Sequence, residues 1–284
     1  MVVVEVHASS VNPFDTMVRE GYLKDIIPLE LPVTLGGDIA GIVSEVGPGV
    51  EGFKVGDKVY GQANVVGGNS GAFAEYALTS MTQVGRMPST LNYAEAASVV
   101  LTGLSAYQAI YEHIGLKAGQ KILIHGGSGG IGSIAIQLAK YIGAHVIVTA
   151  SGDGIEFVKS IGADEVIDYK NQKFEDLVSG VDAVFDTVGG ETYDKSYLVT
   201  KENGVIVSMV AQPDTDLAEK HSINAIYEST HTSTDQLDEL AKLIDQGVLK
   251  THIDKTFKLD DIQAAFIARE SGSIKGKVVV SIKD

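Results

Sequence analysis

Cysteine is absent from this chain of 284 residues. This absence excludes disulfides, thiolate nucleophiles, thiolate zinc sites and iron–sulfur clusters. It is also typical of a reducing compartment, and the first ten residues lack the basic region of a signal peptide, so we expect a cytoplasmic protein. No apolar run approaches the roughly 20 residues that span a bilayer, and a membrane is therefore not expected as a partner.

Positive charge is scarce. The chain has 22 Lys and Arg residues against 37 Asp and Glu residues, which gives a formal net charge of −15. So acidic a protein repels the phosphates of nucleic acids and the anionic surface of a membrane, and neither is expected to bind. Apolar residues make up 44% of the chain, which is typical of a globular protein, and the length predicts about two domains.

The pattern of apolar residues changes along the chain. The first hundred residues are rich in glycine and in short β-branched stretches, which predicts a small barrel-like or sandwich-like domain. After residue 120, apolar strands alternate with amphipathic helices, which indicates a doubly wound parallel sheet covered on both faces. The strands are expected at 121–125, 145–150, 164–168, 182–186 and 204–209, with helices near 130–143, 154–161, 173–179 and 191–200. A helix from about 234 then precedes a strand–helix–strand segment that we expect to return to the first domain.

The sharpest motif is ILIHGGSGGIGSIAIQLAK, residues 122–140. Gly127, Gly129 and Gly132 have the G-x-G-x-x-G spacing, directly after an apolar strand and at the start of an amphipathic helix. Glycine permits the tight turn and the close approach of a pyrophosphate, which the free N–H groups of the helix N-terminus then bind. The motif predicts a dinucleotide site; the alternative is a glycine-rich turn without a ligand.

The end of the second strand of this domain favours NADPH over NADH. NAD sites usually have Asp or Glu there, whereas this chain has Ser151, whose hydroxyl tolerates a 2′-phosphate. Tyr169 and Lys170, after the third strand, can supply further contacts. Asp153 lies two residues beyond Ser151, and no Lys or Arg lies between residues 151 and 154, so NADH stays open.

Several motifs in order extend this prediction to the whole chain. They include SVNPFD (10–15), LGGDIAGIVSEVG (35–47), ILIHGGSGGIG (122–132), FDTVGG (185–190) and GKVVV (276–280). Together they resemble the medium-chain dehydrogenase/reductase superfamily, and within it the zinc-independent branch of quinone oxidoreductases and alkenal/enone reductases. The resemblance implies an α/β protein with a GroES-like catalytic domain, residues 1–96 and 250–284, and an inserted Rossmann domain, residues 97–249. It also implies a homodimer that transfers hydride from NADPH to a small-molecule quinone or α,β-unsaturated carbonyl.

The chain departs from the family at its N-terminus, and it lacks the metal ligands of the zinc-dependent members. Family members usually begin with a further β-hairpin before the strand that corresponds to VVVEVH, so we expect a fragment or a misassigned start codon. Zinc-dependent relatives have a cysteine near SVNPFD and Gly-His-Glu where this chain has Gly36, Gly37 and Asp38. No histidine here has H-x-x-E or H-x-x-x-H spacing, so no metal site and no catalytic zinc is expected.

The resemblance also assigns cofactor-binding positions. Thr102 corresponds to a threonine near the nicotinamide carboxamide, and Val188 to a residue near the nicotinamide ribose. Gly127, Ser128, Gly129, Gly130, Ile131 and Gly132 are expected around the pyrophosphate, and Ser151 and Tyr169 around the 2′-phosphate. Gly154 stands where the branch often has a lysine.

Two residues are candidates for catalysis. Reduction of an enone places negative charge on the carbonyl oxygen, and Asn12 of SVNPFD is the candidate donor to that oxygen, although Asn-Pro can also simply start a turn. Tyr22 is a candidate proton donor, beside a ribose hydroxyl or water. The function expected is an NADPH-dependent, zinc-independent reductase of quinones or enones. The alternatives are an enoyl-thioester reductase of the same fold and a non-catalytic NADPH-binding sensor or scaffold.

Overall fold

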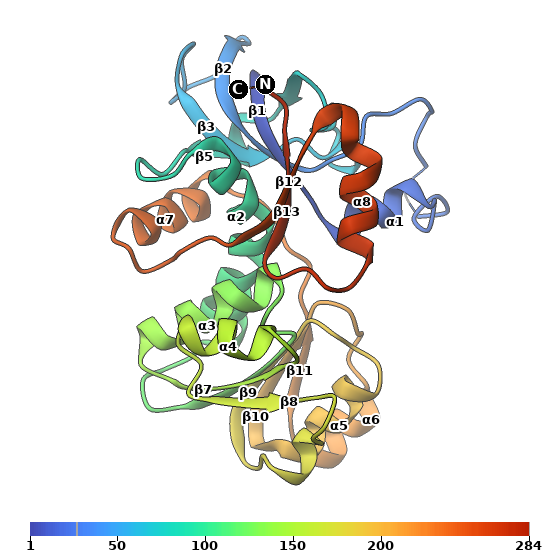
Figure 1. Cartoon of the computed structure of the whole chain (residues 1–284), viewed down its shortest axis with the longest axis vertical. Coiled ribbons are helices and arrows are strands. Elements are labelled where there is room, and N and C mark those ends of the chain that lie inside the picture. Colours follow the sequence, from blue (N-terminus) through green and yellow to red (C-terminus); the bar gives the residue numbers. More distant parts are fainter. Residues whose placement is uncertain (27, 284) are drawn as a thin grey trace. The chain divides into compact units, whose positions relative to one another are not determined.

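The computed structural model describes residues 1–26 and 28–283, which form two compact units (Figure 1). The first unit comprises residues 1–104 and 232–284, and the second comprises residues 105–231. The first unit thus includes residues 97–104 and 232–249, which the sequence predicts to lie in the Rossmann domain.

The first unit is built on a mainly antiparallel sheet of seven strands in the described residues, in the order β12-β13-β1-β2-β3-β5, with β4 paired to β1. Its strands are β1 (Val2–Val11), β2 (Asp38–Val46), β3 (Lys58–Gln62), β4 (Tyr76–Thr79), β5 (Val84–Arg86), β12 (Ile253–Lys258) and β13 (Lys277–Ser281). Its helices are α1 (Pro13–Arg19), α7 (Thr234–Asp245), α8 (Ile262–Glu270) and the start of α2 (Tyr93–Tyr107). The C-terminal segment therefore returns to this sheet as expected, with β13 antiparallel beside β1.

Alternation of side chains along β1 places the core of this unit. Val2, Val4 and Val6 are fully buried, while the residues between them are half-buried, which is the period-two pattern of a strand with one face on a core. These valines pack with Ile39 and Val43 of β2. Burial of each such side chain contributes about 1.5–3 kcal/mol relative to exposure.

Helix α7 belongs to the first unit because its apolar face packs on β5. Leu237 and Leu240 are fully buried, and a Cβ added at Gly85 of β5 would lie 2.6 Å from Cβ of Leu237. The buried Tyr60 of β3 donates its hydroxyl to the carbonyl oxygen of Leu237 at 2.5 Å. A pattern that shows only an amphipathic helix does not reveal which sheet the helix covers.

The second unit is built on a parallel sheet of six strands in the described residues, in the order β11-β10-β9-β6-β7-β8. Its strands are β6 (Lys121–His125), β7 (His145–Ala150), β8 (Glu165–Asp168), β9 (Val181–Asp186), β10 (Thr200–Ser208) and β11 (Asn224–Tyr227). Its helices are α3 (Gly130–Ile142), α4 (Gly154–Ser160), α5 (Glu191–Val199) and α6 (Thr215–His221), and a π-helix spans Gln108–Ile114. This is the Rossmann strand order, as expected.

The direction of the strand order reverses between β6 and β9. From β6 the chain steps outward through α3, β7 and α4 to β8, and from β9 it steps the opposite way through α5, β10 and α6 to β11. Since such crossovers are right-handed, α3 and α4 cover one face of the sheet and α5 and α6 cover the other, as Figure 1 shows. The carboxyl ends of β6 and β9 therefore flank the crevice in which ligands bind in open α/β sheets.

Not every expected element forms. The stretch 173–179, expected to be a helix, contains a single 3-10 turn at Phe174–Asp176. Helix α1 and the pair α6 and β11 were not expected, and they are only four to seven residues long. Such short segments give too few turns for an apolar period to be recognised. Within the described residues no helix is long and apolar enough to cross a membrane.

His125 ends β6 inside the core of the second unit. It is fully buried, with Nδ1 3.1 Å from Oγ1 of Thr149 and Nε2 3.3 Å from Oγ of Ser196, and its ring meets that of Phe174 edge-on. Burial lowers the pKa of His125 to about 4, although the neighbouring Asp186 acts in the opposite direction. The imidazole is therefore neutral and structural at neutral pH.

The depressed pKa of His125 makes the stability of this chain dependent on pH. Its folded pKa of about 4 lies below its ordinary value of 6.5, so between these pH values the unfolded chain binds a proton that the folded chain excludes. We expect His125 to reduce the free energy of unfolding by about 3 kcal/mol as the pH falls through this window. Urea unfolding of His125→Gln across the same window should show a shallower loss than that of the wild type. A loss in His125→Gln as steep as that of the wild type would contradict the assignment.

Candidate active site

The glycine motif forms the turn between β6 and α3. A Cβ added at Gly127 would lie 2.0 Å from Cγ1 of Val148 on the neighbouring strand, and one at Gly132 would lie 2.4 Å from the carbonyl oxygen of Gly126. A side chain at residue 127 would displace the side chain of Val148, and one at residue 132 would require the backbone to move. By contrast, a Cβ at Gly129 meets nothing closer than 3.4 Å. The outer glycines therefore bring helix, turn and strand together, whereas the middle one leaves space beside the turn.

The first turn of α3 carries backbone donors without intrahelical partners. Gly129 is the N-cap with extended backbone, so the N–H groups of Gly130, Ile131 and Gly132 precede the first intrahelical hydrogen bond. The next amide, that of Ser133, already donates to the carbonyl oxygen of Gly129 at 2.9 Å. Unpaired N–H groups and the positive end of the helix dipole suit an anion such as a pyrophosphate. The pyrophosphate of a dinucleotide therefore fits the start of α3, where these donors have no intrahelical partner and residue 129 carries no side chain.

The loop after β9 meets the glycine turn at the switch point. Thr187 donates its hydroxyl to the carbonyl oxygen of His125 at 2.9 Å, and a Cβ added at Gly126 would lie 2.4 Å from Oγ1 of Thr187 and 3.3 Å from Cγ2 of Val188. The side chain of Val188 is 55% exposed. The structure therefore brings Val188 to the glycine turn, with apolar surface available to a ligand.

A buried carboxylate fixes this loop. Asp186, fully buried at the end of β9, accepts hydrogen bonds from the N–H groups of Val188 and Gly189 at 3.0 Å each, and from Oγ of Ser208 at 2.7 Å. Ser208 in turn accepts from the N–H groups of Val210 and Ala211. One carboxylate thus orders the loops that follow both β9 and β10.

Ser151 and Tyr169 lie together at the same edge of the sheet. They follow Ala150 of β7 and Asp168 of β8, which are paired in register, and the N–H of Tyr169 donates to the carbonyl oxygen of Ala150 at 3.3 Å. Ser151 is half-buried and Tyr169 is exposed. The predicted residues of the pyrophosphate and the 2′-phosphate thus lie along one edge of one sheet. Thr102 lies in the first unit, where its hydroxyl donates to the carbonyl oxygen of Ser98 at 2.9 Å.

The first unit contains a second polar centre, around Asp38 at the start of β2. This carboxylate is fully buried and accepts from Oγ of Ser10 and Nδ2 of Asn12, both at 2.7 Å, and from the N–H of Leu101 at 3.2 Å. The buried ammonium of Lys277 on β13 lies 4.0 Å from Asp38 and donates to the carbonyl oxygen of Val11 at 3.0 Å. Burial lowers the pKa of Lys277, and the charge of Asp38 opposes that effect.

The two charges fix the orientation of Asn12. Its Oδ1 accepts from the Lys277 ammonium, which can only donate, and its Nδ2 donates to Asp38, which can only accept. Asn12 is 3% exposed, and its backbone N–H donates to Asp15 at 2.8 Å, where burial raises the pKa of Asp15 to about 7. An amide nitrogen carries two hydrogens, and the second one of Nδ2 has no acceptor among the described residues.

Tyr22 lies in a different environment. Its side chain is 72% exposed in the turn after α1, and its backbone N–H donates to the carbonyl oxygen of Met17 at 3.0 Å. Its hydroxyl has no hydrogen bond to another residue in the described part of the chain. Asn12 is thus rigidly held, whereas Tyr22 is not.

Three charged residues with structural importance were not recognised from the sequence. Asp38, Asp186 and Lys277 all lie within motifs that carry the resemblance, but a charged residue beside an apolar strand is usually exposed. The available signal is position: each is the first or last residue of a strand whose other residues are mostly apolar. The described residues also contain no group of three His, Cys, Asp or Glu side chains that could hold a metal ion.

Comparison with known proteins adds the family. The family model described as "Alcohol dehydrogenase GroES-like domain" matches residues 1–89, and the one described as "Zinc-binding dehydrogenase" matches residues 161–280. The mitochondrial NAD(P)H oxidoreductase RTN4IP1 of Mus musculus is 33% identical over 325 residues, with 99% of this chain and 81% of that protein covered. The chloroplastic NADPH-dependent alkenal/one oxidoreductase of Arabidopsis thaliana is 33% identical over 287 residues, with coverages of 98% and 71%.

Solved structures agree with these relatives. The quinone oxidoreductase of Coxiella burnetii has a TM-score of 0.91 and 34% identity, with 99% of this chain and 90% of that chain covered. The Escherichia coli quinone oxidoreductase complexed with NADPH has a TM-score of 0.88 and 28% identity, with coverages of 99% and 91%. The family expected from the ordered motifs is thereby confirmed, and the chain belongs to the medium-chain dehydrogenase/reductase superfamily, among relatives named quinone oxidoreductase and alkenal/one oxidoreductase.

Proposed function

We propose that this chain is a zinc-independent, NADPH-dependent oxidoreductase that reduces quinones or α,β-unsaturated carbonyl compounds. The observation that carries the proposal is the glycine turn at the switch point of the parallel sheet, where Gly127 and Gly132 let strand, turn and helix pack closely and the first N–H groups of α3 have no intrahelical partner. The names of the relatives, which include quinone and alkenal/one oxidoreductases, support the class of acceptor.

The protein's part in this reaction is to bind, orient and stabilise charge. A bound nicotinamide supplies the hydride, which in enone reduction adds to the β-carbon while a proton adds to the α-carbon. Negative charge develops on the carbonyl oxygen during the transfer, so a fixed donor at that oxygen accelerates the reaction. The free Nδ2 hydrogen of Asn12 is our candidate, because Asp38 and Lys277 hold the amide in one orientation before the substrate binds.

A second group must donate the proton to the α-carbon. Tyr22 is our candidate donor, since its hydroxyl is accessible and makes no hydrogen bond to another described residue. A ribose hydroxyl of the cofactor and water are the alternatives.

The choice of cofactor rests on the edge of the sheet beyond the glycine turn. Ser151 and Tyr169 offer hydroxyl groups where a carboxylate would repel a 2′-phosphate, and Lys170 is exposed on the same turn. An NADPH complex of a related quinone oxidoreductase supports the same choice. A homodimer and a cytoplasmic location stay predictions, and two of the relatives named above are mitochondrial and chloroplastic.

Turnover is the direct test of the proposal. We expect NADPH to be oxidised, as followed by the loss of its absorbance, when a benzoquinone, a naphthoquinone or a short 2-alkenal is added. Prior dialysis against a strong chelator should leave the rate unchanged, because the proposed chemistry uses no metal. NADPH binding without turnover on any acceptor would instead indicate the non-catalytic alternative. A loss of activity on dialysis that zinc restores would contradict zinc independence.

Two glycine variants separate cofactor binding from folding in the same assay. Gly129→Ala should leave the melting temperature near that of the wild type, because nothing lies closer than 3.4 Å to the added carbon. It should nevertheless weaken NADPH binding at least about tenfold, because the methyl group enters the pyrophosphate cradle. Gly132→Ala should lower both the melting temperature and the affinity for NADPH, because its Cβ would lie 2.4 Å from a carbonyl oxygen. Unchanged NADPH binding in Gly129→Ala would contradict the proposed cradle.

Ser151→Asp should reverse the preference between the two nicotinamide cofactors. The new carboxylate repels a 2′-phosphate and accepts a hydrogen bond from a ribose 2′-hydroxyl, so the ratio of kcat/KM for NADPH to that for NADH should fall about 100-fold. Ser151→Ala is the matched control and should change the ratio far less, since it adds no charge. A wild-type protein that prefers NADH would overturn the assignment of Ser151.

Asn12→Ala should lower kcat about 100-fold while the dissociation constant for NADPH stays the same, because the variant removes a donor to the developing oxyanion and no cofactor contact. A melting curve confirms that the variant is folded at the assay temperature. Tyr22→Phe is measured beside it, with a fall of about 100-fold expected for an acid. An unchanged kcat in either variant removes that residue from the proposed mechanism.

A further inference from the structure

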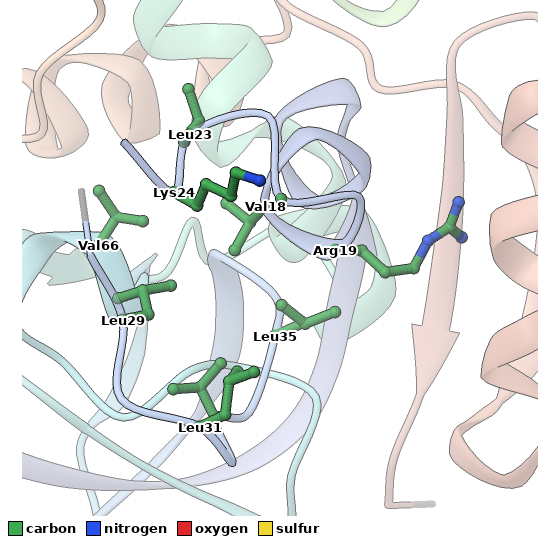
Figure 2. Close-up of a pocket in the computed structure, with 10 residues that line it drawn as sticks. Val18, Arg19, Leu23, Lys24, Leu29, Leu31, Leu35 and Val66 are labelled. Carbon is green, nitrogen blue, oxygen red and sulfur yellow. The ribbon is translucent and has the colours of Figure 1, made fainter. Parts of the chain in front are cut away.

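A pocket in the first unit is not used by the mechanism proposed above. It has a volume of about 340 Å³ and lies between the C-terminal end of α1, residues 21–24 and 29–35, and Val66 (Figure 2). This volume is at the lower end of the range for small-molecule sites and is too small for a protein segment such as a helix. The natural occupant is therefore a small ligand.

The walls of this pocket are aliphatic. Four leucines, Leu23, Leu29, Leu31 and Leu35, line it together with three valines, and no aromatic side chain is among the described lining residues. The side chain of Leu31 is 81% exposed, although it faces the pocket with the others in Figure 2. Rings bind best against aromatic faces, whereas leucine and valine walls suit a flexible alkyl chain. A ligand chain here would cover apolar surface that is otherwise in water.

One cation at this pocket is available to a ligand. Arg19 is engaged by Glu20 at 2.7 Å and Glu270 at 2.8 Å, and Figure 2 shows its side chain directed away from the leucines. Lys24 extends toward Val18 across the pocket in the same view, and among the described residues its ammonium has no ion pair or hydrogen bond. An unpaired ammonium beside an aliphatic wall selects a chain that carries an anionic oxygen.

We propose that this pocket is a subsite for an unbranched alkyl chain that ends in a carboxylate, with the chain against the leucines and the carboxylate at Lys24. This inference rests on the proposed function and refines it: among acceptors, it favours enones that carry an aliphatic acid tail over fused-ring quinones.

Binding of saturated fatty carboxylates tests the subsite without turnover, since these molecules contain nothing to reduce. Calorimetry of the full chain with hexanoate, heptanoate and octanoate should give affinities that rise about fourfold per methylene. Octanol should bind more weakly than octanoate. Affinities that do not depend on chain length, or equal affinities for octanol and octanoate, would overturn the proposal.

Two exposed positions supply variants that keep the fold. Lys24→Gln should weaken octanoate binding about tenfold, and Leu31→Ser about as much, whereas Lys54→Gln, at an exposed lysine elsewhere in the first unit, should leave it unchanged. Equal affinities in Lys24→Gln and Lys54→Gln would overturn the role of Lys24. If Leu31→Ser instead dissociates an oligomer and leaves octanoate binding intact, a second copy of the chain covers this face and the proposal fails.

Turnover distinguishes this proposal from the function on which it rests. Enones with a long carboxylate tail should have a higher kcat/KM than short alkenals, and the advantage should disappear in Lys24→Gln. Reduction of short alkenals without any octanoate binding would leave the proposed function standing and the subsite refuted. Octanoate binding without reduction of any acceptor would support the subsite and refute the proposed function.

Discussion

Each unit of this protein depends on a carboxylate that is buried and yet fully hydrogen-bonded. Burial of an unpaired charge costs many kcal/mol, so such a group persists only where several donors meet it. Asp38 collects donors from β1, from the residue before α1 and from α2, and Asp186 collects them from the loops after β9 and β10. Segments that are distant in the sequence are thereby tied to a single point in each unit.

These carboxylates lie beside parts of the chain that belong to no helix or strand and yet are held in one conformation. The loop at Val188 and the residue Asn12 have no helix or strand ladder of their own, and apolar packing alone fixes neither a peptide plane nor an amide orientation. Well-packed apolar residues in place of a buried ion pair often preserve stability. What such a replacement would lose here is direction, since Asp38 and Lys277 fix which end of the Asn12 amide lies beside the acceptor and which lies beside the donor. We interpret the buried charges as devices of orientation rather than of stability.

The sequence predicts the second unit far better than the first. Strands β6 and β7 begin and end at the predicted residues, because apolar runs between glycine and polar turns leave little choice of boundary. The division into units was harder, since α7 has one apolar face and the sequence does not say that β5 covers it. The cluster around Asp38 could not be predicted from the sequence either. Its members come from residues 10 to 277, and only the register of β1 with β2 and β13 brings them together.

Packing also accounts for the missing lysine of the family. A Cβ at Gly154 would lie 3.0 Å from Cβ of Ser128 and 3.1 Å from its Oγ, so any side chain at this position pushes on a residue of the phosphate turn. The start of α4 therefore lies close to this turn and suits a glycine better than a lysine. A 2′-phosphate at this edge would be met by the hydroxyls of Ser151 and Tyr169 and by Lys170 from the next strand end. Selectivity for NADPH would then come chiefly from the absence of a carboxylate at residue 151, because the start of α4 supplies no positive charge.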